Sequence, residues 1–165
     1  LDVLLDAIAP LGDKVVLRTI GDTVVSRGDF NPMRPLSFVE YLGWLDREQV
    51  AAHMKSADFL VVPSRWEGFG LVALEAMRLS LPVIVSRVGG LREIVDDGRY
   101  GLCFEPGHPD ALRHCIETIR YENIAQWRQL ARQRFMDSFT SASMTRAIDG
   151  LYTELSAEGG LQPAR

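Results

Sequence analysis

The fold is decided by a stretch near the middle of the chain, Pro63-Ser64-Arg65-Trp66-Glu67-Gly68-Phe69-Gly70-Leu71-Val72-Ala73-Leu74-Glu75-Ala76-Met77. Before it stands Phe59-Leu60-Val61-Val62, a short apolar run of strand-forming residues. After the loop, residues 71–79 contain neither glycine nor proline and predict a helix. The stretch therefore predicts a strand, a glycine-containing loop and a helix, in that order.

A junction of this kind favours the binding of an anion. The N–H groups of the first helical turn have no partner within the helix, and the helix dipole is positive at that end. Phosphate is the usual occupant of such a site. Gly68 and Gly70 have no Cβ, so the loop can bend sharply and a ligand can approach its backbone closely. We expect Phe69, which stands between them, to be a packing residue.

Two glutamates flank the glycines. Glu75 lies in a segment that is apolar on nearly all sides, so we expect it to be buried, where an ionised carboxylate needs hydrogen-bond donors. Glu67 precedes the first helical turn and can face the same crevice. Sugar hydroxyls are suitable neutral donors for carboxylates beside a phosphate. Taken singly, Glu75 could instead pair with Arg78 and Glu67 could be a solvated charge, but the combination favours a binding site.

Composition narrows the class of protein. The chain has 165 residues, 47% of them hydrophobic, which fits one domain with one core, and its net charge of −4 argues against a nucleic-acid-binding surface. Neither a membrane-spanning run nor a signal peptide is recognisable, so we expect a cytoplasmic protein. Cys103 and Cys115 are expected to be buried free thiols. The chain lacks His-Glu-x-x-His and Asp-x-Asp motifs, and we expect no metal.

The remaining segments alternate between strand and helix patterns. We expect strands at residues 14–20, 38–43, 58–62, 83–86 and 100–104, and helices at residues 1–11, 46–57, 71–79, from 91, 110–119, 124–135 and 143–155. Asp46 is the expected N-cap of its helix, and residues 23–36 read as a loop. Arg128, Arg132 and Arg134 are expected on a solvated face.

Right-handed crossovers between these strands give an α/β fold, a Rossmann-like open parallel sheet with helices on both faces. Ligands of such sheets bind beyond the carboxyl ends of the strands. We expect four loops at those ends: Gly21-Asp22, Gly43-Trp44-Leu45, residues 64–70, and residues 87–90 with Gly89 and Gly90.

Several motifs together resemble one family: Pro-Ser-x-x-Glu-Gly-Phe-Gly-Leu, the second glutamate eight positions on, Pro82-Val83-Ile84-Val85-Ser86, Gly89-Gly90, Glu93-Ile94-Val95 and Asp97-Gly98. They resemble the donor-binding signature of the retaining GT-B glycosyltransferases typified by sucrose, glycogen and lipopolysaccharide glycosyl transferases, the family 4-like or group 1 glycosyl transferases. The resemblance runs without a gap from Ala57 to about Pro106. It implies that residues 1–165 are the C-terminal, nucleotide-sugar-binding half of a GT-B fold.

The resemblance also implies roles for individual residues. Glu67, Gly68, Phe69 and Gly70 would bind the donor sugar, Gly70 and Leu71 the diphosphate, and Glu75 the ribose hydroxyls. The backbone of Gly43, Trp44 and Leu45 would lie near the base, with the Trp44 side chain packed. The loops at Gly21, Asp22, Gly89 and Gly90 would border the crevice. The parent enzyme would transfer the sugar, with retention of configuration, to a glycan or a lipid-linked saccharide.

The chain departs from the family in two places. Ser80 replaces a glycine in the turn after the helix, and the Arg and Lys-Gly that precede the first helix in the family are not present. Because the first helix also starts without a capping residue, we expect a domain truncated at its N-terminal edge. The acceptor domain, its expected partner, would belong to the same parent chain. The fragment alone would be inactive, and the parent could associate peripherally with the inner face of the membrane.

Two other functions stay open at this point. Gly68-Phe69-Gly70-Leu71-Val72-Ala73 fits the Gly-x-Gly-x-x-Gly/Ala pattern of an NADP-binding oxidoreductase domain, with Arg87 placed to meet a 2′-phosphate. Against this, the loop after the strand is too long, and Glu75 would have no role. The other alternative is a non-catalytic nucleotide-binding module.

Overall fold

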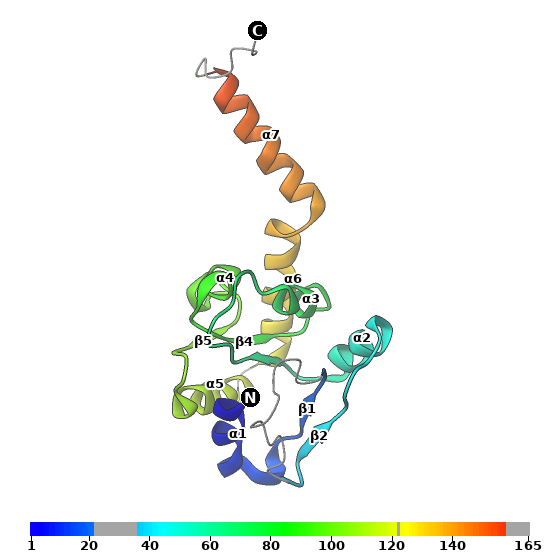
Figure 1. The fold of residues 1–165 in the computed structure, drawn as a ribbon. Coiled ribbons are helices and arrows are strands. Elements are labelled where there is room, and N and C mark those ends of the chain that lie inside the picture. Colours follow the sequence, from blue (N-terminus) through cyan, green and yellow to red (C-terminus); the bar gives the residue numbers. More distant parts are fainter. Residues whose placement is uncertain (22–35, 122, 158–165) are drawn as a thin grey trace, which may run out of the picture.

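The structure, a computed structural model, describes residues 1–21, 36–121 and 123–157 (Figure 1). Its elements in chain order are α1 (Asp2–Ile8), the 3₁₀ helix η1 (Ala9–Lys14), β1 (Leu17–Thr19), β2 (Val39–Tyr41), α2 (Arg47–Ser56), β3 (Leu60–Val62), α3 (Leu71–Arg78), β4 (Val83–Ser86), α4 (Gly89–Ile94), the 3₁₀ helix η2 (Asp96–Gly98), β5 (Leu102–Phe104), α5 (Pro109–Tyr121), α6 (Ile124–Ser138) and α7 (Ser141–Ala157). Asp22 and most of the expected 23–36 loop lie outside the described residues.

The strands form two parallel sheets. β1 pairs with β2, with Leu17 opposite Val39, and the second sheet has the order β3-β4-β5. All of these described pairs are parallel. Figure 1 shows β1 and β2 on one side of the molecule and β4 and β5 on the other. The parallel α/β fold is confirmed, but the sheet is interrupted between β1 and β3.

Helices cover both faces of the three-stranded sheet, as β4 shows most clearly. All four residues of β4 are buried. Val83 and Val85 belong to a core cluster with residues of α2, α3, α4 and α6, whereas Ile84 belongs to a second cluster with residues of α1 and α5. Because successive side chains of a strand point to opposite faces, the two clusters are the two faces of the sheet.

Two helix ends match their sequence signals. The Asp46 carboxylate accepts from Gln49 N at 2.8 Å, and the Gln49 side chain accepts from Asp46 N at 3.0 Å, which completes a capping box and confirms the N-cap. After α3, Leu81 N donates to Ala76 O and Ser80 N to Met77 O, a Schellman turn. Ser80 occupies its left-handed position with a φ of 61°.

The expectation that the arginines of α6 lie on a solvated face holds only for Arg132, which is exposed; Arg128 and Arg134 are half-buried. Arg128 donates to Ala57 O at 2.8 Å, Arg132 donates to Arg78 O, and Arg134 donates to Ile94 O at 3.0 Å and to Glu93 O at 2.8 Å. These carbonyls stand at the C-terminal ends of α2, α3 and α4. Helix C-termini carry unpaired carbonyls and partial negative charge, which is why guanidinium groups bind there.

The last helix, α7, extends away from the rest of the molecule in Figure 1. Five large apolar side chains recur along it at helical spacing and are exposed: Met144, Ile148, Leu151, Tyr152 and Leu155. Among the described residues, no element covers this stripe of α7. No helix among the described residues is long and apolar enough to cross a membrane.

The two cysteines are free, as expected, with Cys115 buried and Cys103 half-buried. The Cys115 thiol donates to Cys103 O at 3.8 Å. Burial raises the pKa of both thiols, so both are protonated at neutral pH. Protonated, shielded thiols are poor nucleophiles, which makes a structural role the simplest one for both.

Candidate functional site

The loop between β3 and α3 is anchored by Ser86, at the carboxyl end of β4. Ser86 is fully buried, and its hydroxyl lies 2.5 Å from Ser64 O and 3.3 Å from Val62 O. The shorter of the two bonds goes to Ser64, so the buried hydroxyl finds its acceptor in the backbone of the loop after β3. The contact fixes the start of the loop against the neighbouring strand.

Gly70 ends the loop and begins α3, and only glycine fits there. Its φ is 94°, and a Cβ on it would lie 2.6 Å from Leu91 Cδ2. No side chain caps the first turn of α3. Within the described part of the chain, no protein group accepts from the N–H groups of Gly68, Gly70 or Leu71. The helix N-terminus therefore presents free donors and the positive end of its dipole.

Gly89 and Gly90 pack directly on this loop. A Cβ on Gly89 would lie 1.9 Å from Glu67 O, and one on Gly90 would lie 2.6 Å from Phe69 O. The two glycines therefore allow the start of α4 to approach the 67–69 backbone more closely than any side chain permits. This contact positions the loop, and it does so whether or not the two glycines also contact a ligand.

The loops after β1 and β2 also meet. Gly21 N donates to Gly43 O at 2.8 Å, and both glycines have positive φ. Trp44 follows, with 73% of its surface exposed, so the expectation that its side chain is packed is wrong. The structure thus brings together Gly21 with the 43–45 loop, and separately the 64–70 loop with Gly89 and Gly90.

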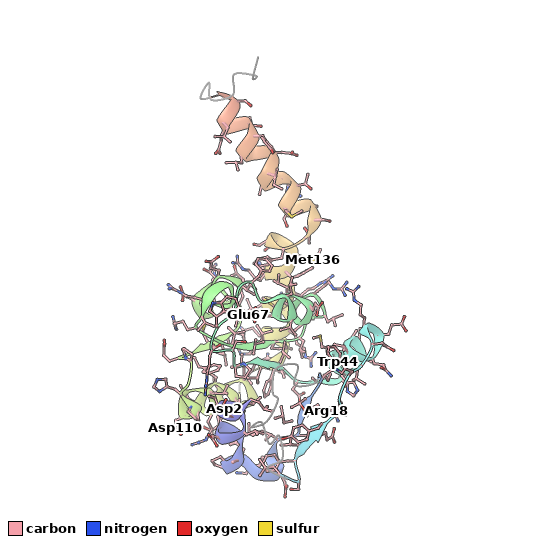
Figure 2. The ribbon with its side chains drawn as sticks, in the orientation of Figure 1. Asp2, Arg18, Trp44, Glu67, Asp110 and Met136 are labelled. Atoms are coloured by element: carbon pink, nitrogen blue, oxygen red, sulfur yellow. The ribbon has the colours of Figure 1, made fainter. Side chains whose placement is uncertain are left out.

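A groove of about 1230 Å³ runs between the two sheets. At the carboxyl end of the strands its rim includes Gly21, Trp44, Leu45, Pro63 and Val72. Glu67 and Glu75 do not line it. Figure 2 shows Trp44 on the side of β1 and β2 and Glu67 over the three-stranded sheet.

Residues 1–120 match the family described as "Glycosyl transferases group 1". The chain is also 38% identical over 156 residues to an uncharacterized glycosyltransferase of Methanocaldococcus jannaschii, a match that covers 94% of this chain and 44% of the relative. This chain belongs to the group 1 glycosyltransferases. The alternative of an NADP-dependent oxidoreductase is therefore set aside.

Further similar proteins support the assignment of this chain to the glycosyltransferases. Glycogen synthase of Mycobacterium tuberculosis is 33% identical over 121 residues, 72% of this chain and 29% of that enzyme. The structure of Anabaena HepE in complex with UDP superposes with a TM-score of 0.80 at 25% identity, over 93% of this chain and 45% of HepE. Sucrose-phosphate synthase of Thermosynechococcus elongatus gives a TM-score of 0.62 at 36% identity, over 74% and 31%. The fold is that of a GT-B domain, and the chain spans less than half of the length of each of these proteins.

Glu75 is exposed in this glycosyltransferase domain, so the expectation that it is buried is wrong. The buried stripe of α3 is limited to Ala73, Leu74, Ala76 and Met77, and Glu75 points away from it. The expected alternative, a pair with Arg78, is not formed either: no group in the described ranges bonds to the Glu75 carboxylate. Glu75 is thus free to meet a ligand.

Glu67 is half-buried, and Phe69 is more exposed than expected. The Ser64 hydroxyl donates to Glu67 Oε2 at 3.5 Å, and no cation of the described residues pairs with that carboxylate. Phe69 has 54% of its surface exposed, so it is not the packing residue that the sequence indicates. Its backbone, held by Gly90, carries the structural contact instead.

Sequence reasoning missed the anchoring role of Ser86 and the place of Val72 at the groove rim. A serine that closes an otherwise apolar strand was the available signal, because a buried hydroxyl needs a backbone acceptor. No cluster of three or more His, Cys, Asp or Glu side chains that could hold a metal ion occurs in the described part of the chain. That the enzyme needs no metal stays a prediction.

Proposed function

We propose that residues 1–165 are the donor-binding domain of a retaining glycosyltransferase. The parent enzyme would transfer a sugar from a nucleotide-diphosphate sugar to an acceptor such as a glycan or a lipid-linked saccharide. The observation that carries the proposal is the uncapped N-terminus of α3, which follows Gly70 in a loop fixed by Ser86, Gly89 and Gly90.

The diphosphate of the donor would bind at this helix N-terminus. As the bond to the sugar breaks, negative charge develops on the departing diphosphate. The N–H groups of Gly70 and Leu71 are donors whose positions are set before the ligand arrives, because the backbone of the loop is fixed at both ends. Preorganised donors of this kind stabilise a transition state without reorganising during the reaction.

The two glutamates would hold hydroxyl groups of the donor. Glu75 stands four residues after Leu71, on the same exposed face of α3, so it lies one turn behind the proposed diphosphate site. It would accept from the ribose hydroxyls. Glu67, in the loop before the helix, would accept from the sugar hydroxyls, and neither glutamate would act as an acid or base.

UDP is the first nucleotide to test, because HepE was crystallised with UDP. The base would lie near the backbone of Gly43, Trp44 and Leu45, next to Gly21. The exposed indole of Trp44 offers a flat apolar face there. The acceptor domain would be supplied by the remainder of the parent chain, which we propose works in the cytoplasm, at the inner face of the membrane when its acceptor is lipid-linked.

The proposal is tested by measuring UDP binding calorimetrically to the wild-type chain and to Glu75→Gln. We expect the substitution to weaken UDP binding about tenfold, the equivalent of about 1.4 kcal/mol, because the amide replaces a charged acceptor. Glu154→Gln, on the exposed face of α7, is the matched control and should bind as the wild type does. If Glu75→Gln keeps its fold and its dissociation constant for UDP is unchanged, Glu75 does not bind the ribose hydroxyls.

A further inference from the structure

The side chain of Trp66, in the loop between β3 and α3, is the most exposed large apolar side chain of the described residues, at 84%. None of these residues forms a hydrogen bond or a ring contact with its indole. Three more exposed apolar side chains follow within six positions: Phe69, Leu71 and Val72. Folded proteins usually cover a tryptophan, because its ring carries a large apolar surface. An uncovered apolar surface therefore lies at the N-terminus of α3.

The backbone on both sides of Trp66 is fixed. Before it, the carbonyl of Ser64 accepts from the buried Ser86 hydroxyl at 2.5 Å. After it, the carbonyl of Glu67 lies so close to Gly89 that a Cβ on this glycine would be 1.9 Å away. The direction of the Cα–Cβ bond of Trp66 is therefore set by the fold. A tryptophan then has only two side-chain torsions left to order when it meets a ligand.

The ring of Trp66 leans toward the glycines of the loop. A Cβ on Gly68 would lie 3.8 Å from Cη2 of Trp66, so the far edge of the ring stands beside the Gly68 backbone. The N–H group of Gly68 has no acceptor in the described part of the chain. The Glu67 carboxylate bonds there only to the Ser64 hydroxyl, at 3.5 Å, and so keeps free acceptor positions. One short segment thus offers an aromatic face, a backbone donor and a carboxylate.

We propose that the indole of Trp66 is a stacking platform for the sugar ring of the donor, and that it makes the domain prefer the nucleotide sugar to the free nucleotide. This inference rests on the proposed function. A pyranose ring carries C–H groups on its faces and hydroxyl groups around its rim. Its face would pack on the indole, while its rim hydroxyls would bond to Glu67 and the Gly68 N–H. A phosphate group would be repelled by Glu67 and would make no use of an apolar face.

The test measures the dissociation constants of UDP and UDP-glucose by calorimetry. Trp66→Ala should weaken UDP-glucose binding about tenfold and change UDP binding less than about twofold, because only the sugar loses its contact. Trp66→Phe keeps an aromatic face and should restore most of the loss. Trp44→Ala is the contrasting variant: near the base, it should weaken both ligands by the same factor. The melting temperatures of the Trp66 variants check that the fold is intact.

The possible failures are distinguishable. If the wild-type chain binds neither ligand, the proposed function is contradicted, and the role of Trp66 with it. If both ligands bind and Trp66→Ala leaves their ratio of affinities unchanged, only the role of Trp66 is wrong.

The parent enzyme tests whether another part of the protein covers Trp66 instead. There, Trp66→Ala should leave the melting temperature unchanged and weaken UDP-glucose binding as in the isolated chain. A fall of several degrees with unchanged UDP-glucose binding would show that the indole packs against protein, and would overturn the proposal.

Discussion

Ser80 carries a local strain that its neighbours impose. It stands at the left-handed position of the Schellman turn that ends α3, with a φ of 61°. Leu81, directly after it, is buried and donates to Ala76 O at 2.9 Å, so the turn cannot relax without disturbing the core. A residue with a Cβ in this conformation costs roughly 1 kcal/mol relative to glycine.

We expect Ser80→Gly to stabilise the domain by about 1 kcal/mol, or about 2–4 °C in melting temperature, because glycine adopts positive φ without strain. Thermal unfolding followed by circular dichroism measures this. Ser80→Ala is the control, because it keeps the Cβ and should gain nothing. Equal melting temperatures for Ser80→Gly and the wild type would show that the turn is not strained.

Glu75, Phe69 and Trp44 show where reasoning from single residues failed. A window rich in apolar residues predicts a helix that is buried all round, but burial depends on which faces meet a neighbour. α3 meets α6, α4 and the sheet with one side only, and that leaves Glu75 exposed with Leu71. In our proposal the ligand would meet these exposed sides.

At the scale of elements, α6 ties three other helices together. Its arginines bind the C-terminal carbonyls of α2, α3 and α4, and Arg134 also lies 5.3 Å from the ring of Tyr100 and 5.2 Å from that of Phe139. Carbonyls at a helix end have no partner in the helix, so each guanidinium satisfies groups that would otherwise depend on water.

We expect Arg134→Gln to lower the free energy of unfolding by about 2 kcal/mol, because it removes three hydrogen bonds of the guanidinium and two ring contacts. Urea denaturation measures the change. Arg146→Gln on α7 is the matched control and should change stability by no more than about 0.5 kcal/mol, since that side chain is exposed. If the two variants were equally stable, the contacts of Arg134 would contribute nothing.

A second connection between elements is ionic. Arg92 binds both carboxylate oxygens of Asp97, at 2.7 and 2.9 Å, and Arg87, in the loop after β4, donates to Asp97 Oδ1 at 2.9 Å. The hydrogen bonds from Arg92, and then the charges of both arginines, hold the pKa of Asp97 below its ordinary value of 3.8. A lowered pKa in the folded state means that the unfolded state takes up the proton first as pH falls.

The stability that Asp97 contributes should therefore be complete above about pH 4 and lost as the pH falls further, through the folded-state pKa. Asp97→Asn keeps a residue that tolerates the φ of 51° and removes the charge. We expect its melting temperature to lie slightly below that of the wild type at pH 6, because an exposed ion pair contributes little, and the difference to vanish at the acid end of a titration. A difference that persisted unchanged at pH 2 would contradict an ionic origin.

At the scale of the whole molecule, the described residues leave apolar surfaces uncovered. The chain spans 44% of its relative from Methanocaldococcus jannaschii, α7 presents an unpartnered apolar stripe, and the groove between the sheets is open. These features are consistent with our proposal that an acceptor domain in the same parent chain completes the enzyme.

We expect the isolated chain to bind UDP weakly and to transfer no sugar, because the reacting sugar would be enclosed by only one side of its cleft. Release of UDP from UDP-glucose, with and without candidate acceptors, measures turnover, and the parent enzyme is the positive control. Acceptor-dependent release of UDP by the isolated chain above background would refute this.

The sequence by itself determined the order of strands and helices, the family, and the junction at Gly70. These depend on local patterns, such as apolar periodicity, the Asp46 N-cap and a glycine-containing loop, which short-range physics dictates. Only the tertiary structure decided that Glu75 is exposed and that Ser86 anchors the loop. It also decided that three arginines of α6 bond to carbonyls at helix C-termini, and that the sheet is interrupted between β1 and β3. Those features depend on which surfaces meet across long stretches of chain, and a local pattern carries no information about a distant neighbour.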